Sequence, residues 1–243
     1  MHTVLAKIAG INVEFNTLIS DLSNVCKSYI VSDVKPDIIV TVTQDEVEGE
    51  KSLAPFEEDV SLEICESICA HRGLCKQIWK FDALVLHCAT FAVDGRAIAF
   101  AAKSGTGKTT HMRLWKRYLG DKMIAINGDK PIIRFFDGVP YAHGTPWRGK
   151  EGFGKNMAAP LTDICFIERD TNNSVVPTTK EDALNRIFNQ ILLPNDPMGS
   201  VKTLQMVDDI LNKCNLWIIK CNMEPEAAEV AYNQIIKNGK DKI

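Results

Sequence analysis

The residues with the clearest chemistry in this sequence form a glycine-rich stretch that reads Ala-Lys-Ser-Gly-Thr-Gly-Lys-Thr-Thr at 102–110. When such a turn joins a strand to a helix, its backbone N–H groups point inward and form an anion site at the positive end of the helix. The pattern G-x-x-x-x-G-K-[ST] is typical of loops that hold nucleotide phosphates, with the lysine near the β- and γ-phosphates and the hydroxyl on Mg²⁺. Ala102 stands where the pattern has its first glycine. The residues expected to bind the cofactor are Ser104, Gly105, Thr106, Gly107, Lys108, Thr109 and Thr110.

Asp129 is the candidate acid. It follows Lys108 by 21 positions and comes just after the next strand expected along the chain, 123–126. A carboxylate there can hold Mg²⁺ or take the proton of an attacking hydroxyl. The expected metal ligands are therefore Thr109 and Asp129. The alternative is an ordinary Asn-Gly-Asp turn, which the upstream loop makes the weaker interpretation.

Three more side chains are candidates for catalysis. His87 lies in an apolar run 21 positions before Lys108, and can be either a core residue or a residue that faces the phosphates. The segment 144–156 concentrates three cations, four glycines and a tryptophan. Within it, Arg148 and Lys150 can stabilise charge on a phosphoryl group in transfer. The alternative for this segment is a solvated surface loop.

Composition excludes several classes of protein. The chain has 243 residues, a formal net charge of −3 and 45% hydrophobic residues, which fits one large domain or a domain with a small appendage. No overall positive field favours nucleic acid or an anionic membrane. There is no apolar run of about 18 residues that would span a bilayer and no N-terminal signal peptide, so we expect a cytoplasmic protein.

Four residues of metal-ligating types cluster in one stretch, which contains three of the eight cysteines. Cys65, Cys69, His71 and Cys75 could bind zinc, but their spacing matches no common zinc pattern. Buried thiols on a helix are the favoured interpretation.

Hydrophobic periodicity predicts the elements that must position these residues. The N-terminal part should contain a strand–turn–strand unit at 4–15, a strand at 37–43, an acidic loop at 44–59 and a helix from 61 to about 79. Strands at 83–93 and 97–102, joined at Asp94-Gly95, should lead into the phosphate loop and the helix after it, which ends at Gly120. The later elements are expected to be a hairpin at 132–142, a strand at 161–168, helices at 180–193 and 202–213, a strand at 216–220 and a helix at 225–237. The expected fold class is α/β with a mixed, α+β-like sheet.

Several of these stretches together resemble a known family. They are 86–89 (Leu-His-Cys-Ala), 100–115 with the phosphate loop, 127–129 (Asn-Gly-Asp), 144–150 (Gly-Thr-Pro-Trp-Arg-Gly-Lys) and, less specifically, 221–227. In these the chain is similar to the HPr kinase/phosphatase-like proteins, and most to their small bacterial branch, which share the nucleotide-binding fold of phosphoenolpyruvate carboxykinase. The resemblance divides the chain into a β-rich N-terminal segment, 1–60, packed on an HPr kinase-like P-loop core, 61–243.

The resemblance implies a largely antiparallel sheet around the loop and a histidine before it, which His87 matches. It also implies an acidic pair after the next strand, of which the chain keeps only Asp129 beside Gly128. An Arg-Gly motif is matched by Arg148-Gly149.

Two functions follow as expectations. The first is a kinase that uses ATP and Mg²⁺ to transfer the γ-phosphoryl group to a hydroxyl, on a serine of a protein or peptide or on a small metabolite. The second is a nucleotide-binding regulatory or scaffold protein with little turnover, which the missing second acid favours. Carboxykinase chemistry fits less well because the chain is short for a second substrate-binding lobe. The expected partners are a nucleotide and a hydroxyl-bearing acceptor, without nucleic acid or membrane, and a homo-oligomer is compatible with the sequence.

Overall fold

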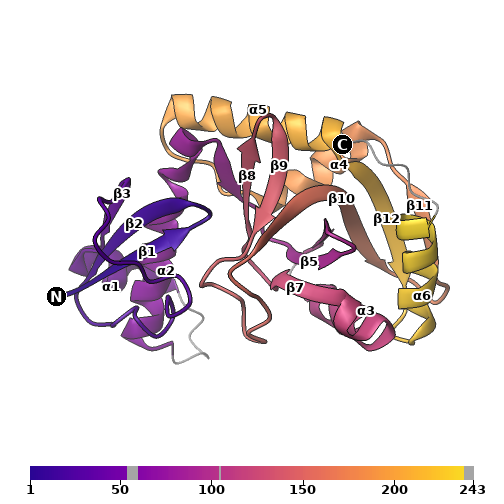
Figure 1. Ribbon diagram of the computed structural model, residues 1–243, viewed down its shortest axis with the longest axis horizontal. Coiled ribbons are helices and arrows are strands. Elements are labelled where there is room, and N and C mark those ends of the chain that lie inside the picture. The colour runs from indigo at the N-terminus through magenta and orange to yellow at the C-terminus, as the bar shows by residue number, and fades with distance from the viewer. Residues whose placement is uncertain (54–59, 104, 238–243) are drawn as a thin grey trace.

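The computed structural model describes residues 1–53, 60–103 and 105–237. Two sheets organise the chain (Figure 1). The strands are β1 (His2–Ile8), β2 (Ile11–Thr17), β3 (Ile38–Thr41), β4 (Ala83–Val85), β5 (Ala89–Val93), β6 (Arg96–Ala101), β7 (Met123–Asn127), β8 (Ile132–Phe136), β9 (Val139–His143), β10 (Ala158–Arg169), β11 (Ser174–Pro177) and β12 (Asn215–Cys221). The α-helices are α1 (Gln44–Leu53), α2 (Leu62–Cys75), α3 (Lys108–Leu119), α4 (Lys180–Ile187), α5 (Pro197–Lys213) and α6 (Glu226–Tyr232).

The N-terminal body is a small sheet covered by two helices. β1 and β2 form the predicted antiparallel hairpin, and β3 adds to β2 in parallel. The helix α2 packs its buried face, including Cys65 and Leu74, into the same hydrophobic core as Phe15 and Val40. The predicted division of the chain near residue 60 stays a prediction. The helix α2 follows that boundary in the sequence but shares its hydrophobic core with the strands that precede it.

The prediction of an acidic loop at 44–59 is wrong over the described residues of that range, because residues 44–53 form the helix α1. A capping box starts this helix: Thr43 N–H donates to the Glu46 carboxylate, while Glu46 N–H donates to the Thr43 hydroxyl. Val47 is fully buried and fixes the helix to the body. Residues 54–59 of the expected loop lie outside the described residues.

The larger sheet is mixed and curled, and its centre is β10. The first residues of β10 pair antiparallel with β9, which continues to β8 and β4. The rest of β10 pairs in parallel with β6 on one side and β12 on the other. Beyond β6 come β5 and β7, both antiparallel, and β11 flanks β12. The expected α/β class with a mixed sheet is confirmed.

Helices cover both faces of this sheet (Figure 1). On one face α3 and α6 pack around the fully buried ring of Trp115. On the other face α4 and α5 bury Ile187 and Ile210 against the sheet. No helix in the described ranges is long and apolar enough to cross a membrane.

The boundaries of two strands that precede the loop, β4 and β5, differ from the sequence expectation. The strand expected at 83–93 is interrupted, since β4 ends at Val85 and β5 begins at Ala89. Between them, Leu86 N–H donates to Pro131 O and His87 N–H donates to Gln190 O at 2.7 Å, so the backbone leaves one part of the sheet and enters another. His87 therefore lies at a strand break and not within a strand.

The helices after β11 also differ in extent. The helix expected at 180–193 ends at Ile187 and continues as a 3₁₀ helix, Phe188–Gln190. The next helix begins five residues before 202, at Pro197, because Asp196 caps it by accepting from Gly199 N–H at 2.7 Å. β11 itself was not expected from the sequence.

Candidate functional site

The glycine-rich loop that is expected to bind phosphate follows β6 and leads into the N-terminus of α3. Gly105 and Gly107 have φ values of 76° and 128°, which side chains other than glycine rarely adopt. Lys108 is only 8% exposed, and its Nζ donates to the carbonyl oxygen of Ala102 at 2.8 Å. Burial lowers the pKa of Lys108, partly offset by Cys88 and Asp129. Ser104 lies outside the described residues.

The backbone conformation of Ala102 explains why an alanine can stand at the first glycine position of the pattern. Ala102 does not have a positive φ, so its backbone does not require glycine. Its contribution is the carbonyl oxygen that accepts the Lys108 ammonium.

Arg169 holds the loop from the end of β10. Its Nε donates to Thr106 O at 3.1 Å and its Nη2 to Gly105 O at 2.5 Å. The strands β10 and β6 are parallel, with Phe166 opposite Ala101. Their carboxyl ends therefore meet at one edge of the sheet, where open α/β sheets bind ligands. Sequence reasoning missed Arg169, because a single cation at the end of a strand matches no motif.

His87 and Asp129 meet beside the loop. His87 Nε2 lies 3.2 Å from Asp129 Oδ1. Burial would raise the pKa of Asp129, but the hydrogen bond with His87 and the charges of Lys130 and Lys108 outweigh it and hold that pKa below its usual value. Asp129 is therefore an ionised carboxylate at neutral pH.

Asn127 shapes the turn that carries Asp129. Its Oδ1 accepts from the N–H groups of Asp129 and Lys130 at 2.8 and 2.7 Å. Its Nδ2 donates to Thr145 Oγ1 at 2.9 Å and to Trp147 O at 3.1 Å. This fully buried amide thus connects Asp129 to the segment that contains Arg148. The sequence showed only an Asn-Gly turn at this point.

The 144–156 segment lies against Gly128, the position at which the family resemblance implies a second acid. A Cβ at this position would lie 3.0 Å from Arg148 O and 3.3 Å from Phe153 O, and Gly128 N–H donates to Phe153 O at 2.8 Å. A carboxylate here would displace the segment that carries Arg148.

Arg148 is anchored from the N-terminal body. Its Nη2 donates to Ser28 Oγ at 2.9 Å, and its guanidinium lies 6.0 Å from the Tyr29 ring centroid. Its Nε is buried without a hydrogen-bond partner among the described residues. Since a buried polar donor is normally paired, this atom fits an anion that enters the site.

One cavity of about 430 Å³ collects the predicted residues. Its wall includes the phosphate-loop residues Gly105, Gly107, Lys108, Thr109 and Thr110 and all four catalytic candidates, His87, Asp129, Arg148 and Lys150. The Thr109 hydroxyl and the Asp129 carboxylate are hard oxygen donors on the same cavity, which suits Mg²⁺ with several retained waters. Thr106 is absent from this wall and faces two neighbouring cavities.

The cysteine cluster is a different environment. Cys65, Cys69 and Cys75 are free, buried thiols, and the Cys75 Sγ contacts the His71 ring at 3.6 Å. Burial raises the pKa of Cys75 to about 12 and lowers the pKa of His71 to about 3. Within the described ranges, no group of three or more His, Cys, Asp or Glu side chains could hold a metal ion.

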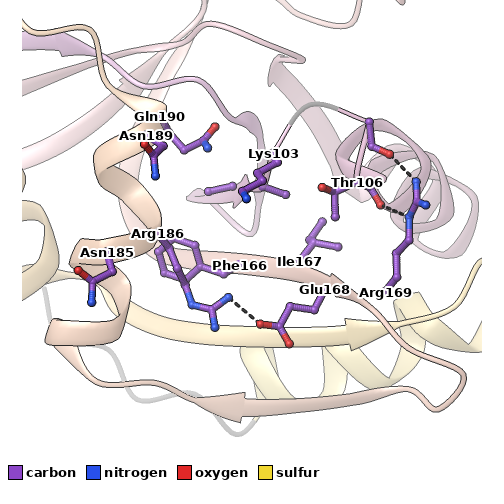
Figure 2. Close-up of a pocket in the computed structure, with 13 residues that line it drawn as sticks. Lys103, Thr106, Phe166, Ile167, Glu168, Arg169, Asn185, Arg186, Asn189 and Gln190 are labelled. Atoms are coloured by element: carbon purple, nitrogen blue, oxygen red, sulfur yellow. Dashed lines mark hydrogen bonds and ion pairs between the residues drawn. The ribbon is translucent and has the colours of Figure 1, made fainter.

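A larger cavity of about 770 Å³ adjoins the loop (Figure 2). Lys103 and Thr106 border it on the loop side, and an ion pair between Glu168 and Arg186 at 2.7 Å lies on its floor. Gln190 closes the edge nearest to His87.

Comparison with known proteins shows a remote structural similarity. No protein-family model matches the chain, and no curated protein matches its sequence. Among solved structures, the chain is similar to the HPr(Ser) kinase/phosphatase from Coxiella burnetii, with a TM-score of 0.36 and 10% sequence identity, over 64% of this chain and 99% of that one. This similarity is too remote to assign residues or an activity.

Proposed function

We propose that the protein is a kinase that transfers the γ-phosphoryl group of ATP to a hydroxyl. The observation that carries the proposal is the convergence of Lys108, Asp129 and Arg148 on one cavity at the N-terminus of α3. A helix N-terminus and loop amides bind phosphates, and phosphoryl transfer needs little beyond positioning and charge stabilisation. The hairpins on both sides of the loop support the carboxykinase type of P-loop fold.

Each side chain has a role in this proposal. The loop amides and Lys108 hold the β- and γ-phosphates. The acceptor oxygen attacks the γ-phosphorus, its proton passes to Asp129, and the bond to the bridging oxygen of ADP breaks. Arg148 and Lys150 stabilise the negative charge of the group in transfer. The acceptor is a serine of a protein or peptide, or a hydroxylated small metabolite.

Magnesium would be held by Thr109 and Asp129. When bound, it would neutralise charge on the phosphates and orient them. The remaining roles belong to the residues of the chain itself.

The test is the substitution Asp129→Asn. We expect it to lower phosphoryl transfer by roughly 100- to 10,000-fold, the usual contribution of a positioned base, while ATP binding persists in a thermal-shift assay. Transfer is measured with radiolabelled ATP, Mg²⁺ and serine-containing peptides or free serine. The control is Asp121→Asn, because Asp121 is a fully exposed acid outside the cavity. Unchanged turnover in Asp129→Asn would exclude the base-or-metal role.

A nucleotide-binding regulatory or scaffold protein is the second candidate. The observation in its favour is Gly128, which leaves Asp129 as the one acid of the Asn-Gly-Asp turn and has no space for a side chain. ATP binding in the thermal-shift assay without transfer to any of these acceptors would favour it over the kinase.

A further inference from the structure

Gln190 connects the segment after α4 to His87 in the candidate site. This residue ends the 3₁₀ helix Phe188–Gln190 and is 7% exposed. Its backbone carbonyl accepts from His87 N–H at 2.7 Å, and the neighbouring residues Leu86 and Ile191 form a β-bridge. Gln190 and His87 are thus fixed to each other by the backbone before their side chains are considered.

The orientation of the Gln190 amide follows from its neighbours. One end of the amide faces the carbonyl oxygens of Ala102 and His87 and the Nδ1 of His87. With the nitrogen at that end, the distances to these three atoms are 3.2, 3.1 and 3.2 Å, all within hydrogen-bond range, and the three acceptors share the two hydrogens of the amide. With the oxygen there, it would face two carbonyl oxygens that can only accept, so the network selects the nitrogen.

We infer that Gln190 is a positioning residue that holds His87 in the tautomer with its proton on Nε2, which leaves Asp129 as the group that takes the acceptor's proton. The amide nitrogen donates, so His87 Nδ1 must accept. A neutral imidazole has one donor and one acceptor nitrogen, and Nε2 is then the donor. This Nε2 lies 3.2 Å from Asp129 Oδ1, and an ionised carboxylate only accepts. Both neighbours of His87 therefore require the same tautomer.

The inference rests on the proposed kinase function and sharpens it. A His87 that donates from Nε2 cannot take the hydroxyl proton with that nitrogen. His87 instead orients the Asp129 carboxylate, whose remaining oxygen lone pairs are left for the acceptor hydroxyl and for Mg²⁺. The same Gln190 amide contacts Ala102 O, which also accepts from Lys108 Nζ, so one side chain joins His87 to the phosphate loop.

The tautomer can be measured directly. Long-range proton–nitrogen NMR spectra of protein with isotope-labelled histidine, recorded near pH 8 where ordinary imidazoles are neutral, distinguish the two protonated nitrogens. The His87 signals are identified by their loss in His87→Gln. We expect the Nε2–H form in the unmodified protein and a mixture of both forms in Gln190→Met, which keeps the volume and removes the donor. A pure Nδ1–H form in the unmodified protein would overturn the inference.

Kinetics provide the second readout. With Mg·ATP and serine-containing peptides, Gln190→Met should lower kcat by about 10- to 100-fold, as expected for a misplaced catalytic group, and change KM for ATP by less than about threefold. The matched control is Leu192→Ala, two residues along in the same segment and 44% exposed, which should change neither value. Unchanged kcat and tautomer in a folded Gln190→Met protein would refute the inference. If the unmodified protein transfers no phosphoryl group, the kinase proposal fails, and the NMR measurement still decides the tautomer.

Discussion

Lys108 is a buried ammonium whose charge is held by a backbone carbonyl. Its contact with Ala102 O fixes the side chain along the inner side of the loop. Such a pre-positioned cation can turn toward a phosphate with little loss of conformational entropy, since burial already restricts its rotamers.

At the residue scale we predict that Lys108→Met weakens ATP binding by roughly 10- to 100-fold, which corresponds to the loss of hydrogen bonds to a charged group of about 1.5–3 kcal/mol. Isothermal titration with Mg·ATP measures the change. The fold should survive, because an apolar side chain of similar length replaces a buried charge. Lys103→Met is the control from the same loop, since Lys103 is exposed and does not line the 430 Å³ cavity. Equal affinity in Lys108→Met and the unmodified protein would contradict the assignment.

The residues that could be predicted from the sequence are those with a motif. The loop residues, Asp129 and His87 follow from spacing, and Arg148 from a segment rich in cations and glycines, before any resemblance is considered. Asn127, Arg169 and Gln190 could not be predicted, because their roles are contacts to backbone atoms distant in the chain. Arg169, for example, binds Gly105 across 64 residues, and no local pattern encodes such a pair.

At the element scale, the end of β10 stabilises the phosphate loop. Arg169 donates two hydrogen bonds to consecutive loop residues, so its guanidinium fixes the direction in which the remaining amides point. The sequence predicted the strand and located its end correctly within one residue, but gave no reason to connect that end with the loop.

We predict that Arg169→Ala lowers ATP affinity about 5- to 150-fold by releasing both loop carbonyls, since two hydrogen bonds at a typical 0.5–1.5 kcal/mol each amount to about 1–3 kcal/mol. Arg169→Lys should recover only part of the loss, because one ammonium cannot replace a planar guanidinium at two sites. Nucleotide titration measures both variants. Lys220→Ala, an exposed cation on the neighbouring strand β12, should bind ATP normally. An Arg169→Ala protein with full affinity would show that the loop does not need this support.

Elements were harder to predict where contacts override local preference. The polar helix α1 was missed because its composition is acidic, whereas a capping box, the buried Val47 and contacts with α2 such as Arg72–Glu50 stabilise it. The interruption at 86–88 was missed because the run is continuously apolar. The interruption exists because β4 pairs with β8 whereas β5 pairs with β6 and β7. Hydrophobic periodicity contains no information about which strands pair.

At the scale of the whole molecule, the N-terminal body supports the site. Asn156 Nδ2 donates to Ser28 O at 2.6 Å, and Trp147 Nε1 donates to Ser67 Oγ at 3.1 Å. Together with the bond from Arg148 to Ser28, these contacts fix the position of the 144–156 segment from outside the larger sheet.

Glu66 links the helix α2 to the segment that follows β2 in the N-terminal body. It is fully buried, and its carboxylate accepts from the N–H groups of Leu18, Ile19 and Ser20 after β2. Burial raises the pKa of Glu66, but these hydrogen bonds outweigh it, and the pKa lies below its ordinary value. A lowered pKa in the folded state stabilises the protein above the unfolded-state pKa, and this contribution is lost as the pH falls through the folded-state pKa.

We therefore predict that Glu66→Gln reduces the free energy of unfolding at pH 7 by roughly 1–3 kcal/mol. The difference from the unmodified protein should shrink as the pH falls below about 4.3, the ordinary glutamate value. Urea unfolding at a series of pH values measures this. Glu48→Gln, an exposed substitution on α1, should leave stability unchanged, and a pH-independent difference for Glu66→Gln would contradict the account.

The contact between Arg169 and the loop also has a consequence for synthesis of the protein. When Gly105 leaves the ribosome, Arg169 at the end of β10 is still 64 residues away, which takes roughly 3–13 s at typical translation rates. During that interval β6 has its hairpin partner β5 but lacks β10, and the loop lacks its guanidinium clamp. Phosphate binding should therefore arise late in folding, and a nucleotide that binds only the finished loop would favour completed chains by mass action.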